Sequence, residues 1–168
     1  MKRRDFIAGL GGTTVTWPVA AWAQQSMPVV GYLGPDTPDR YASRLHSFHR
    51  GLGSAGFSEG KNIKVEYRWA EGKSDRLPAL ALSLVRAQAS VIVTTGSLAS
   101  AHAAKAATRS IPIVFETGAD PIQSGLVASL NRPGGNVTGI TSLNAQVGPK
   151  RLELLHELLP SEIGRAHV

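Results

Sequence analysis

A short polar stretch has the residue types and spacing of an anion-binding turn. Thr94, Thr95 and Ser97 offer hydroxyl groups, and Gly96 lets a ligand approach the backbone closely. The stretch follows an apolar run and comes just before an alanine-rich helix that we expect to begin at Ser97. A helix N-terminus presents unpaired N–H groups and a partial positive charge, which favour a carboxylate. The pattern therefore predicts capture of a small anion or of an amino-acid carboxylate, and Ser97 fits equally well as an ordinary helix cap.

Acidic and hydroxyl side chains follow two other expected strands. They are Asp36 and Thr37 after one strand, and Glu116, Thr117 and Asp120 after another. A carboxylate beside a pocket can hold a ligand ammonium, because opposite charges attract more strongly where water is displaced. The alternative for Asp120 is an Asx-turn before Pro121, and the same alternative applies to Asp36. Tyr32 and Tyr41 could line an apolar pocket nearby, although Tyr41 also fits a core position on a helix face.

Other kinds of site chemistry find little support in the sequence. There is no cysteine, which excludes disulfides and thiol nucleophiles. The stretch 51–56 matches G-x-G-x-x-G, but it ends a helix and precedes a strand, the reverse of the order in a dinucleotide site. His46 and His49 stand three residues apart without a third ligand, so we expect a solvated pair and no metal site. No Ser–His–acid set can be assembled, and we expect neither a cofactor nor enzymatic activity.

Apolar runs alternate with amphipathic segments along most of the chain. Strands are expected at 29–33, 63–69, 91–93, 113–115 and 137–140, of which 91–93 and 113–115 are typical of strands buried on both faces. Five helices are expected between and after these strands. The first runs from Asp39 to a stop at Gly56, the second from a cap at Ser74 or Asp75 through Val85, and the third from Ser97 to about Thr108. The fourth passes through Leu126, Val127 and Leu130, and the fifth runs from Pro149 through Leu159.

Five strand–helix units with short connections predict an α/β fold. We expect a doubly wound, five-stranded parallel sheet of strand order 2-1-3-4-5, with helices on both faces. Ligands of such sheets bind beyond the carboxyl ends of the strands, at the switch point between strands 1 and 3. That rule selects the loops 34–39, 94–98 and 116–123. The candidate ligand-binding residues are therefore Asp36, Thr37, Thr95, Gly96, Ser97, Thr117 and Asp120.

The first 23 residues have the pattern of an export signal. The segment 2–7 (KRRDFI) is similar to the twin-arginine motif, a weakly apolar stretch follows it, and 21–23 (AWA) supplies a small-x-small cleavage pattern. We expect a mature chain that starts at Gln24 and is soluble in the periplasm; an ordinary amphipathic N-terminal helix is the alternative. The net charge of +6 comes partly from this segment, and the other basic residues are scattered, which argues against nucleic-acid binding.

The last residues do not continue the helical periodicity, which ends at 159–160. Translated back into codons, 163–168 (IGRAHV) match the start of a common sequencing adapter, and the next adapter triplet is a stop. We therefore expect 161–168 to be a non-native tail, with adapter read-through from 163. The alternative is a natural frayed terminus, and the codons of the source DNA distinguish the two.

Several segments resemble the substrate-binding proteins of ABC transporters, in the group described as tryptophan/tyrosine-type binding components. They are 28–33 (PVVGYL), 60–72 (GKNIKVEYRWAEG), 75–80 (DRLPAL), 111–115 (IPIVF), 118–121 (GADP), 130–139 (LNRPGGNVTG) and 150–160 (KRLELLHELLP). Each segment is short, but together and in this order they cover nearly all of 28–160.

The resemblance implies a type 1 periplasmic-binding fold, in which two similar α/β lobes close on a ligand. In that family, lobe 1 contacts the ligand from the loops after strands 1, 3 and 4, which here correspond to Thr37, to Thr95, Gly96 and Ser97, and to Asp120. Members of the family are much longer than this chain. The resemblance therefore assigns 24–148 to lobe 1 and 149–160 to a helix leading into a lobe 2 that is missing.

The function implied is that of a periplasmic receptor without chemistry of its own. It would be exported by the twin-arginine machinery, capture an amino acid or a related carboxylate, and deliver it to an ABC permease with its ATPase. One lobe alone should bind weakly or not at all, because ligand sites commonly bury about 70–90% of the ligand surface. An exported α/β enzyme and an extracellular sensor module of a signalling protein are the alternatives.

Overall fold

The computed structural model describes residues 27–142 and 144–159, so the expected export signal, the expected cleavage site before Gln24 and the expected non-native tail 161–168 lie outside the described residues. Five strands form one parallel sheet in the order β2-β1-β3-β4-β5, which confirms the predicted fold class. They are β1 (Val29–Gly34), β2 (Lys64–Trp69), β3 (Val91–Thr95), β4 (Ile113–Thr117) and β5 (Val137–Thr141). All their carboxyl ends therefore meet at one edge of the sheet.

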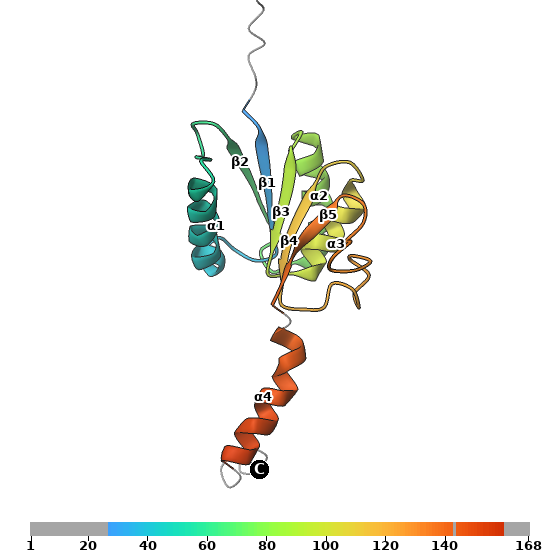
Figure 1. Cartoon of the computed structure of the whole chain (residues 1–168). Helices are drawn as coiled ribbons and strands as arrows, with labels where there is room; N and C mark the ends of the chain where they lie inside the picture. Colours follow the sequence, from blue (N-terminus) through green and yellow to red (C-terminus); the bar gives the residue numbers. More distant parts are fainter. Residues whose placement is uncertain (1–26, 143, 160–168) are drawn as a thin grey trace, which may run out of the picture.

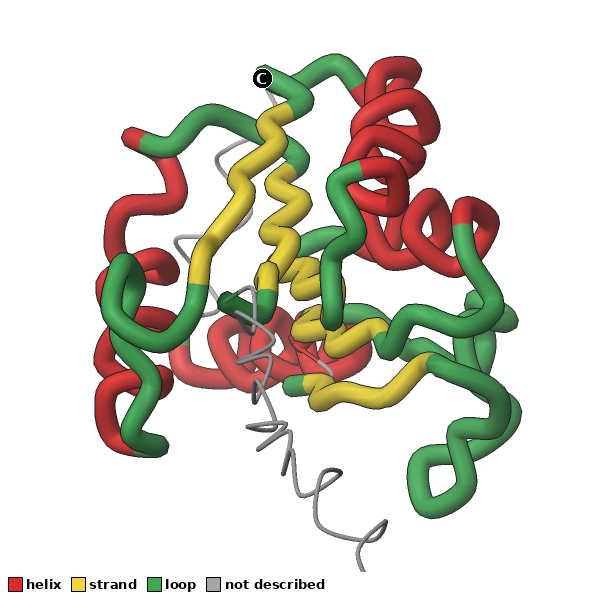
Figure 2. The backbone as a smooth tube through the Cα atoms, turned by 90° about the horizontal axis from the view of Figure 1, so that it is seen from above, coloured by secondary structure: helices red, strands yellow, loops and turns green. Residues whose placement is uncertain are grey.

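Helices cover both faces of this sheet, as expected for a doubly wound fold. One face carries α1 (Ala42–Ser54), and the other carries α2 (Leu77–Arg86) and α3 (Leu98–Ala107) (Figures 1 and 2). Short 3₁₀ turns, Asp39–Tyr41 and Ser74–Arg76, precede α1 and α2. Helix α4 (Asn144–Leu158) leaves the end of β5 and extends away from the sheet (Figure 1).

The larger core lies between the sheet and the α2–α3 layer. Leu77, Ala81 and Leu84 recur at helical spacing on α2 and are buried, as the sequence predicts. On α3 the buried side chains are Ser100, Ala101 and Ala104, whose small size lets the helix approach the strands closely. Each fully buried leucine or isoleucine contributes about 1.5–3 kcal/mol through the removal of apolar surface from water. This core fixes the strands, and with them the turns at the edge.

An aromatic cluster fills the space between α1 and the sheet. The ring centroids of Phe48 and Trp69 each lie 5.3 Å from that of Tyr32, and the Tyr32 side chain is fully buried. Aromatic pairs at such separations contribute about 0.5–1.5 kcal/mol beyond their area burial. A Cβ atom at Gly34 would lie 2.1 Å from the Trp69 ring, so this position requires glycine. The cluster therefore holds α1 against the last residues of β1.

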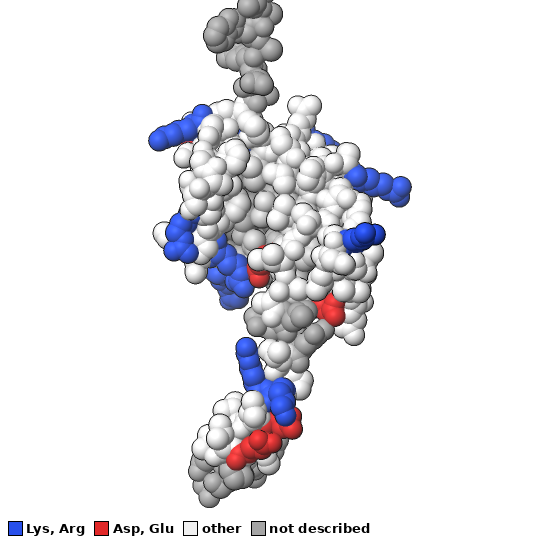
Figure 3. All heavy atoms as spheres, in the orientation of Figure 1, with Lys and Arg blue, Asp and Glu red and all other residues white. Residues whose placement is uncertain are grey.

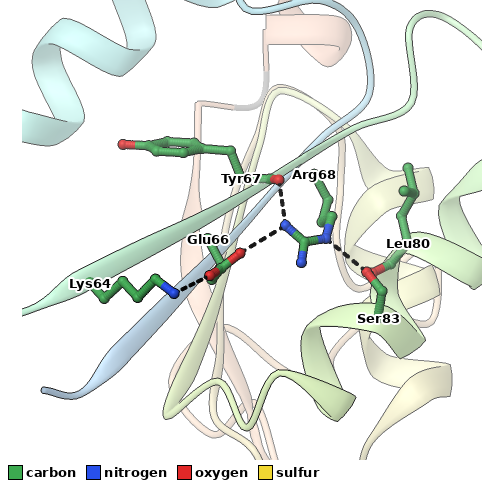
Figure 4. Close-up of polar contacts among 6 residues, drawn as sticks. All are labelled: Lys64, Glu66, Tyr67, Arg68, Leu80 and Ser83. Carbon is green, nitrogen blue, oxygen red and sulfur yellow. Dashed lines mark hydrogen bonds and ion pairs between the residues drawn. The ribbon is translucent and has the colours of Figure 1, made fainter. Parts of the chain in front are cut away.

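Strand β2 is one of the two edge strands of the sheet, and charged side chains line one of its faces. Glu66 binds Lys64 at 2.7 Å and Arg68 at 3.0 Å. Arg68 in turn donates from Nε to Ser83 Oγ of α2 at 2.9 Å, which connects the strand to the helix layer (Figure 4). Charges on an edge strand oppose the addition of strands from another chain. The predicted alternation of apolar and polar residues along this strand is confirmed.

The connection between β4 and β5 is not the helix that the sequence predicts. Asp120 accepts hydrogen bonds from the backbone N–H groups of Ile122 and Gln123, which forms a single turn. Gly125 then takes a φ of +72°, a left-handed conformation that ends the turn. Leu126 is buried as expected, but Leu130 is 56% exposed. Local hydrogen bonding and the glycine outweigh the helical spacing of the apolar residues.

The prediction that both middle strands are buried on both faces is wrong for β4. Val114 is 40% exposed, and Ile140, diagonally across from it on β5, is 69% exposed. Among the described residues, α1 covers the β1–β2 half of this face, and no other helix covers the half formed by β4 and β5 (Figure 2). An apolar run in the sequence predicts a buried strand, but it does not show which segment would pack against each face of that strand.

Two helix starts also differ from the expectation. Pro149 does not begin the last helix; α4 begins at Asn144 and contains the proline, which removes one backbone donor without ending the helix. Ser74 and Asp75 do not cap α2 through their side chains, because they lie in the preceding 3₁₀ turn. Leu152 and Leu155 on α4 are 63% and 48% exposed.

The Glu66 network makes stability depend on pH. The hydrogen bonds from Lys64 and Arg68 hold the pKa of Glu66 below its ordinary value of 4.5. The stabilisation that ionised Glu66 gives to the folded state is therefore complete above pH 4.5. It is lost as the pH falls through the lower pKa that Glu66 has in the folded state. Glu66→Gln should lower the free energy of unfolding by about 0.2–1 kcal/mol near pH 7 and by less near pH 3, as measured by urea denaturation. An equal loss at both pH values would contradict this reading, and Glu153→Gln, in the exposed pair with Lys150, is the control.

Candidate functional site at the carboxyl edge of the sheet

The turns after β1, β3 and β4 lie together at the carboxyl edge, as the switch-point rule predicts. Thr95 pairs in register with Glu116, and the Gly96 N–H donates to the Glu116 carbonyl at 2.9 Å, which joins the turns after β3 and β4. Tyr32 of β1 is linked through its hydroxyl to Thr95 Oγ1 at 2.6 Å. The edge is therefore one continuous surface built from three separate parts of the sequence.

Thr95 is the hydroxyl that the fold orients at this edge. Burial raises the pKa of the Tyr32 hydroxyl above its ordinary value, and the hydrogen bond between the two hydroxyl groups holds Thr95 in place. Tyr32 itself lies in the core and does not line a pocket. Thr94 is fully buried, because β3 continues to Thr95 and alternate strand residues point to opposite faces. Its hydroxyl is therefore not available at the turn.

Gly96 and Glu116 form the centre of the edge. Gly96 has a φ of +70°, and its N–H donates to Glu116 Oε2 at 2.9 Å as well as to the Glu116 carbonyl. Arg44 of α1 reaches the same carboxylate oxygen with Nε at 3.8 Å. The Arg44 guanidinium also lies over the ring of Tyr41, 5.0 Å from its centroid. Sequence reasoning missed Arg44, because nothing in its spacing shows that the first turn of α1 reaches the end of β4.

Ser97 and Thr117 each shape their own turn. The Ser97 hydroxyl oxygen accepts the N–H of Ser100 at 3.3 Å and so caps α3, the alternative that the sequence offered. Thr117 is buried, and its Oγ1 accepts the N–H of Ala119 at 3.2 Å. These hydrogen bonds explain why a hydroxyl side chain is present at both positions, and they require no ligand. A contact between either side chain and a ligand stays a prediction.

Asp36 and Asp120 are also engaged with the backbone. Asp36 accepts the N–H of Thr37 at 2.9 Å and lies 3.4 Å from a guanidinium nitrogen of Arg40. Asp120 makes the Asx-turn described above, with the Ile122 N–H at 2.8 Å. Both carboxylates lie in the loops that begin at the carboxyl edge and add negative charge there. Their roles toward a ligand, like that of the Thr37 hydroxyl, are likewise predictions.

A shallow depression of about 170 Å³ adjoins the edge on the face that α1 leaves open. Its lining includes Val93, Thr95, Val114, Glu116 and Ile140. Sites that enclose a small ligand usually measure about 300–1,000 Å³, so the depression alone is one wall of a site rather than an enclosed pocket. On the face drawn in Figure 3, Lys and Arg side chains are spread over the body without forming a continuous patch.

Within 27–142 and 144–159, no three His, Asp or Glu side chains come close enough to hold a metal ion. His49 lies beside Tyr67 and Glu59, with its Nε2 2.9 Å from the Tyr67 hydroxyl, rather than in a pair with His46. No helix in the described part of the chain is long and apolar enough to cross a bilayer.

The close approach of Gly96 to Tyr41 gives a test of the edge geometry. A Cβ atom at position 96 would lie 2.8 Å from the Tyr41 hydroxyl oxygen, on a backbone with positive φ. Gly96→Ala should therefore lower the free energy of unfolding by about 1–3 kcal/mol in urea denaturation. Gly53→Ala, on open α1 surface, is the control and should raise stability by up to about 1 kcal/mol. A Gly96→Ala variant as stable as the parent would refute the geometry, and Tyr41→Phe should relieve part of its cost.

Comparisons with known proteins point to one family. The family model for ABC transporter substrate binding proteins matches residues 37–163. A curated relative, the tyrosine-binding protein of Clostridioides difficile, is 37% identical over 113 residues, which are 67% of this chain and 32% of the relative. This chain therefore spans only about a third of that relative's length.

Solved structures agree with this assignment. A conserved domain protein of Vibrio cholerae has a TM-score of 0.70 at 28% identity, over 81% of this chain and 45% of the other. A ligand-free, open substrate binding protein of Clostridium difficile has a TM-score of 0.64 at 26% identity, over 80% and 44%. An ABC domain of Streptococcus pneumoniae in complex with L-Trp has a TM-score of 0.63 at 25% identity, over 69% and 39%. By fold and by sequence, the chain belongs to the ABC transporter substrate-binding protein family.

Proposed function

We propose that this chain forms one lobe of an amino-acid receptor of an ABC importer and contributes one wall of its ligand site. The observation that carries the proposal is the convergence of the turns after β1, β3 and β4 at one edge of a parallel sheet, where the half-buried Thr95 and the exposed Gly96 lie beside charged groups. Binding at such an edge needs no catalytic group, and the receptor would capture its ligand unchanged.

The charge at this edge suits a zwitterion. Its carboxylates are Asp36, Glu116 and Asp120, and its guanidinium groups are Arg40 and Arg44. A ligand with both an ammonium and a carboxylate group can pair with the carboxylates and with the guanidinium groups of the edge. A simple anion would be repelled by the carboxylates, and a simple cation would be repelled by the guanidinium groups. Thr37, Thr95, Gly96, Ser97, Thr117 and Asp120 are the proposed contributors from the loops.

Two relatives favour an aromatic amino acid. One is named a tyrosine-binding protein and another was solved with L-Trp. The rings of Tyr41, which is buried, and Trp69, which is half-buried, pack beside the edge with their centroids 5.9 Å apart and make its base apolar on this side. Because this chain spans less than half of those relatives, the opposite wall of the site would come from a second lobe.

The proposed setting is the periplasm. The segment 1–23 would direct export through the twin-arginine machinery, and cleavage near Ala23 would release the receptor. The receptor would then deliver its ligand to a membrane permease that is driven by an ATPase. This part of the proposal rests on the export pattern and on the family.

The proposal predicts weak and local binding. Titration of the isotope-labelled chain with L-tryptophan or L-tyrosine should shift amide resonances in 34–37, 94–98 and 116–121, with a dissociation constant of about 1 mM or weaker, because half of the site is open to water. Thr37→Ala should weaken binding further. The control is Thr138→Ala, which changes an exposed threonine on β5.

Two outcomes would oppose the proposal in different ways. If no edge resonance shifts at about 20 mM amino acid, or if glucose shifts the same resonances as strongly, the amino-acid assignment fails. If calorimetry gives a micromolar dissociation constant, this lobe forms a complete site and the two-wall reading fails.

A further inference from the structure

A cation already occupies the centre of the edge. The Arg44 guanidinium lies between the Glu116 carboxylate and the face of the Tyr41 ring, 3.8 Å from the former and 5.0 Å from the ring centroid. A carboxylate and an aromatic face are two groups that attract an alkylammonium ion. The same two groups would therefore recognise the ammonium group of a ligand.

Glu116 is held firmly, whereas Arg44 is held loosely. Glu116 Oε2 accepts the Gly96 N–H at 2.9 Å, which fixes the carboxylate against the turn after β3. The Arg44 side chain is 51% exposed, and its contact with Glu116 is longer than a hydrogen bond. Exposed ion pairs of this kind contribute little to stability. Arg44 can therefore leave the carboxylate at little cost.

We propose that Glu116 and the Tyr41 ring form an ammonium subsite, and that Arg44 occupies it in place of the ligand until the ligand displaces it. The inference rests on the proposed function, and it names the end of the amino acid that this lobe binds. It assigns to Glu116 the ammonium binding that the sequence suggested for the acidic loop residues in general, and it argues against carboxylate capture by the Gly96 N–H, because that N–H donates to Glu116.

The subsite predicts opposite effects for its two charged side chains. Arg44→Ala removes the competing cation and uncovers the Tyr41 ring, so binding of an ammonium ligand should strengthen by at least about threefold. Glu116→Gln removes the negative charge but keeps an oxygen that can accept the Gly96 N–H, so the turn is retained and binding should weaken by at least about threefold. A purely structural ion pair would give the same sign for both variants.

The experiment uses three probes that share one ring system. Tryptamine carries only the ammonium group, indole-3-propionate carries only the carboxylate, and L-tryptophan carries both. Nuclear magnetic resonance titrations of the full chain follow the Gly96 amide in the parent, Arg44→Ala and Glu116→Gln. Arg50→Ala, an exposed arginine on the same helix, and Glu153→Gln on α4 are the matched controls and should bind like the parent.

Support requires that tryptamine and L-tryptophan shift the Gly96 amide more strongly than indole-3-propionate, with the two variants moving affinity in opposite directions. The proposal is overturned if Arg44→Ala weakens or leaves tryptamine binding unchanged, or if indole-3-propionate binds at Gly96 as tightly as tryptamine. If L-tryptophan shifts the edge resonances equally in all variants, the subsite fails and the proposed function stands. If no probe shifts them in the parent or in Arg44→Ala, both fail.

Discussion

The parallel pairing of β1 with β2 on one side and with β3 on the other is the constraint on which this structure depends. Parallel strands need a crossover between each pair, and right-handed crossovers return every strand with its carboxyl end at the same edge. The order changes direction at β1, so the connections after β1 and β3 diverge to opposite faces and leave the edge between them open. The Tyr32–Thr95 hydrogen bond connects the side chains of β1 and β3 near this opening. Every group assigned to ligand binding is placed by that arrangement.

The edge combines a rigid base with adjustable charged groups. The rigid part consists of the buried Tyr32 ring, the packed residues of α1 and the Gly96–Glu116 hydrogen bond. The adjustable part is Arg44, which is half exposed and loosely paired. A receptor that must bind and release its ligand without changing it benefits from this division, because firm backbone positions give selectivity while a weakly held side chain can be exchanged. The exposed Val114 side chain and the small depression lie on the part of the sheet that α1 leaves open.

Much of the fold could be predicted from the sequence, and the reasons are physical. The apolar runs and their spacing predict the five strands, their order and the three loops, because parallel α/β sheets allow few topologies. The helix expected through Leu126 is absent, since the Asx-turn of Asp120 and the positive φ of Gly125 favour a local turn. Arg44 could not be found, because its place beside Glu116 depends on how α1 packs. The roles of Ser97 and Asp120 remained ambiguous, since capping and ligand binding favour the same residue types.

The most direct test of the account is a crystal structure of the chain grown with L-tryptophan. The account predicts the amino acid at the carboxyl edge, between the Gly96 turn and the Tyr41 ring, with the turns after β1, β3 and β4 still adjacent. Bound ligand elsewhere on the sheet, or turns that separate so that no common surface remains, would contradict it.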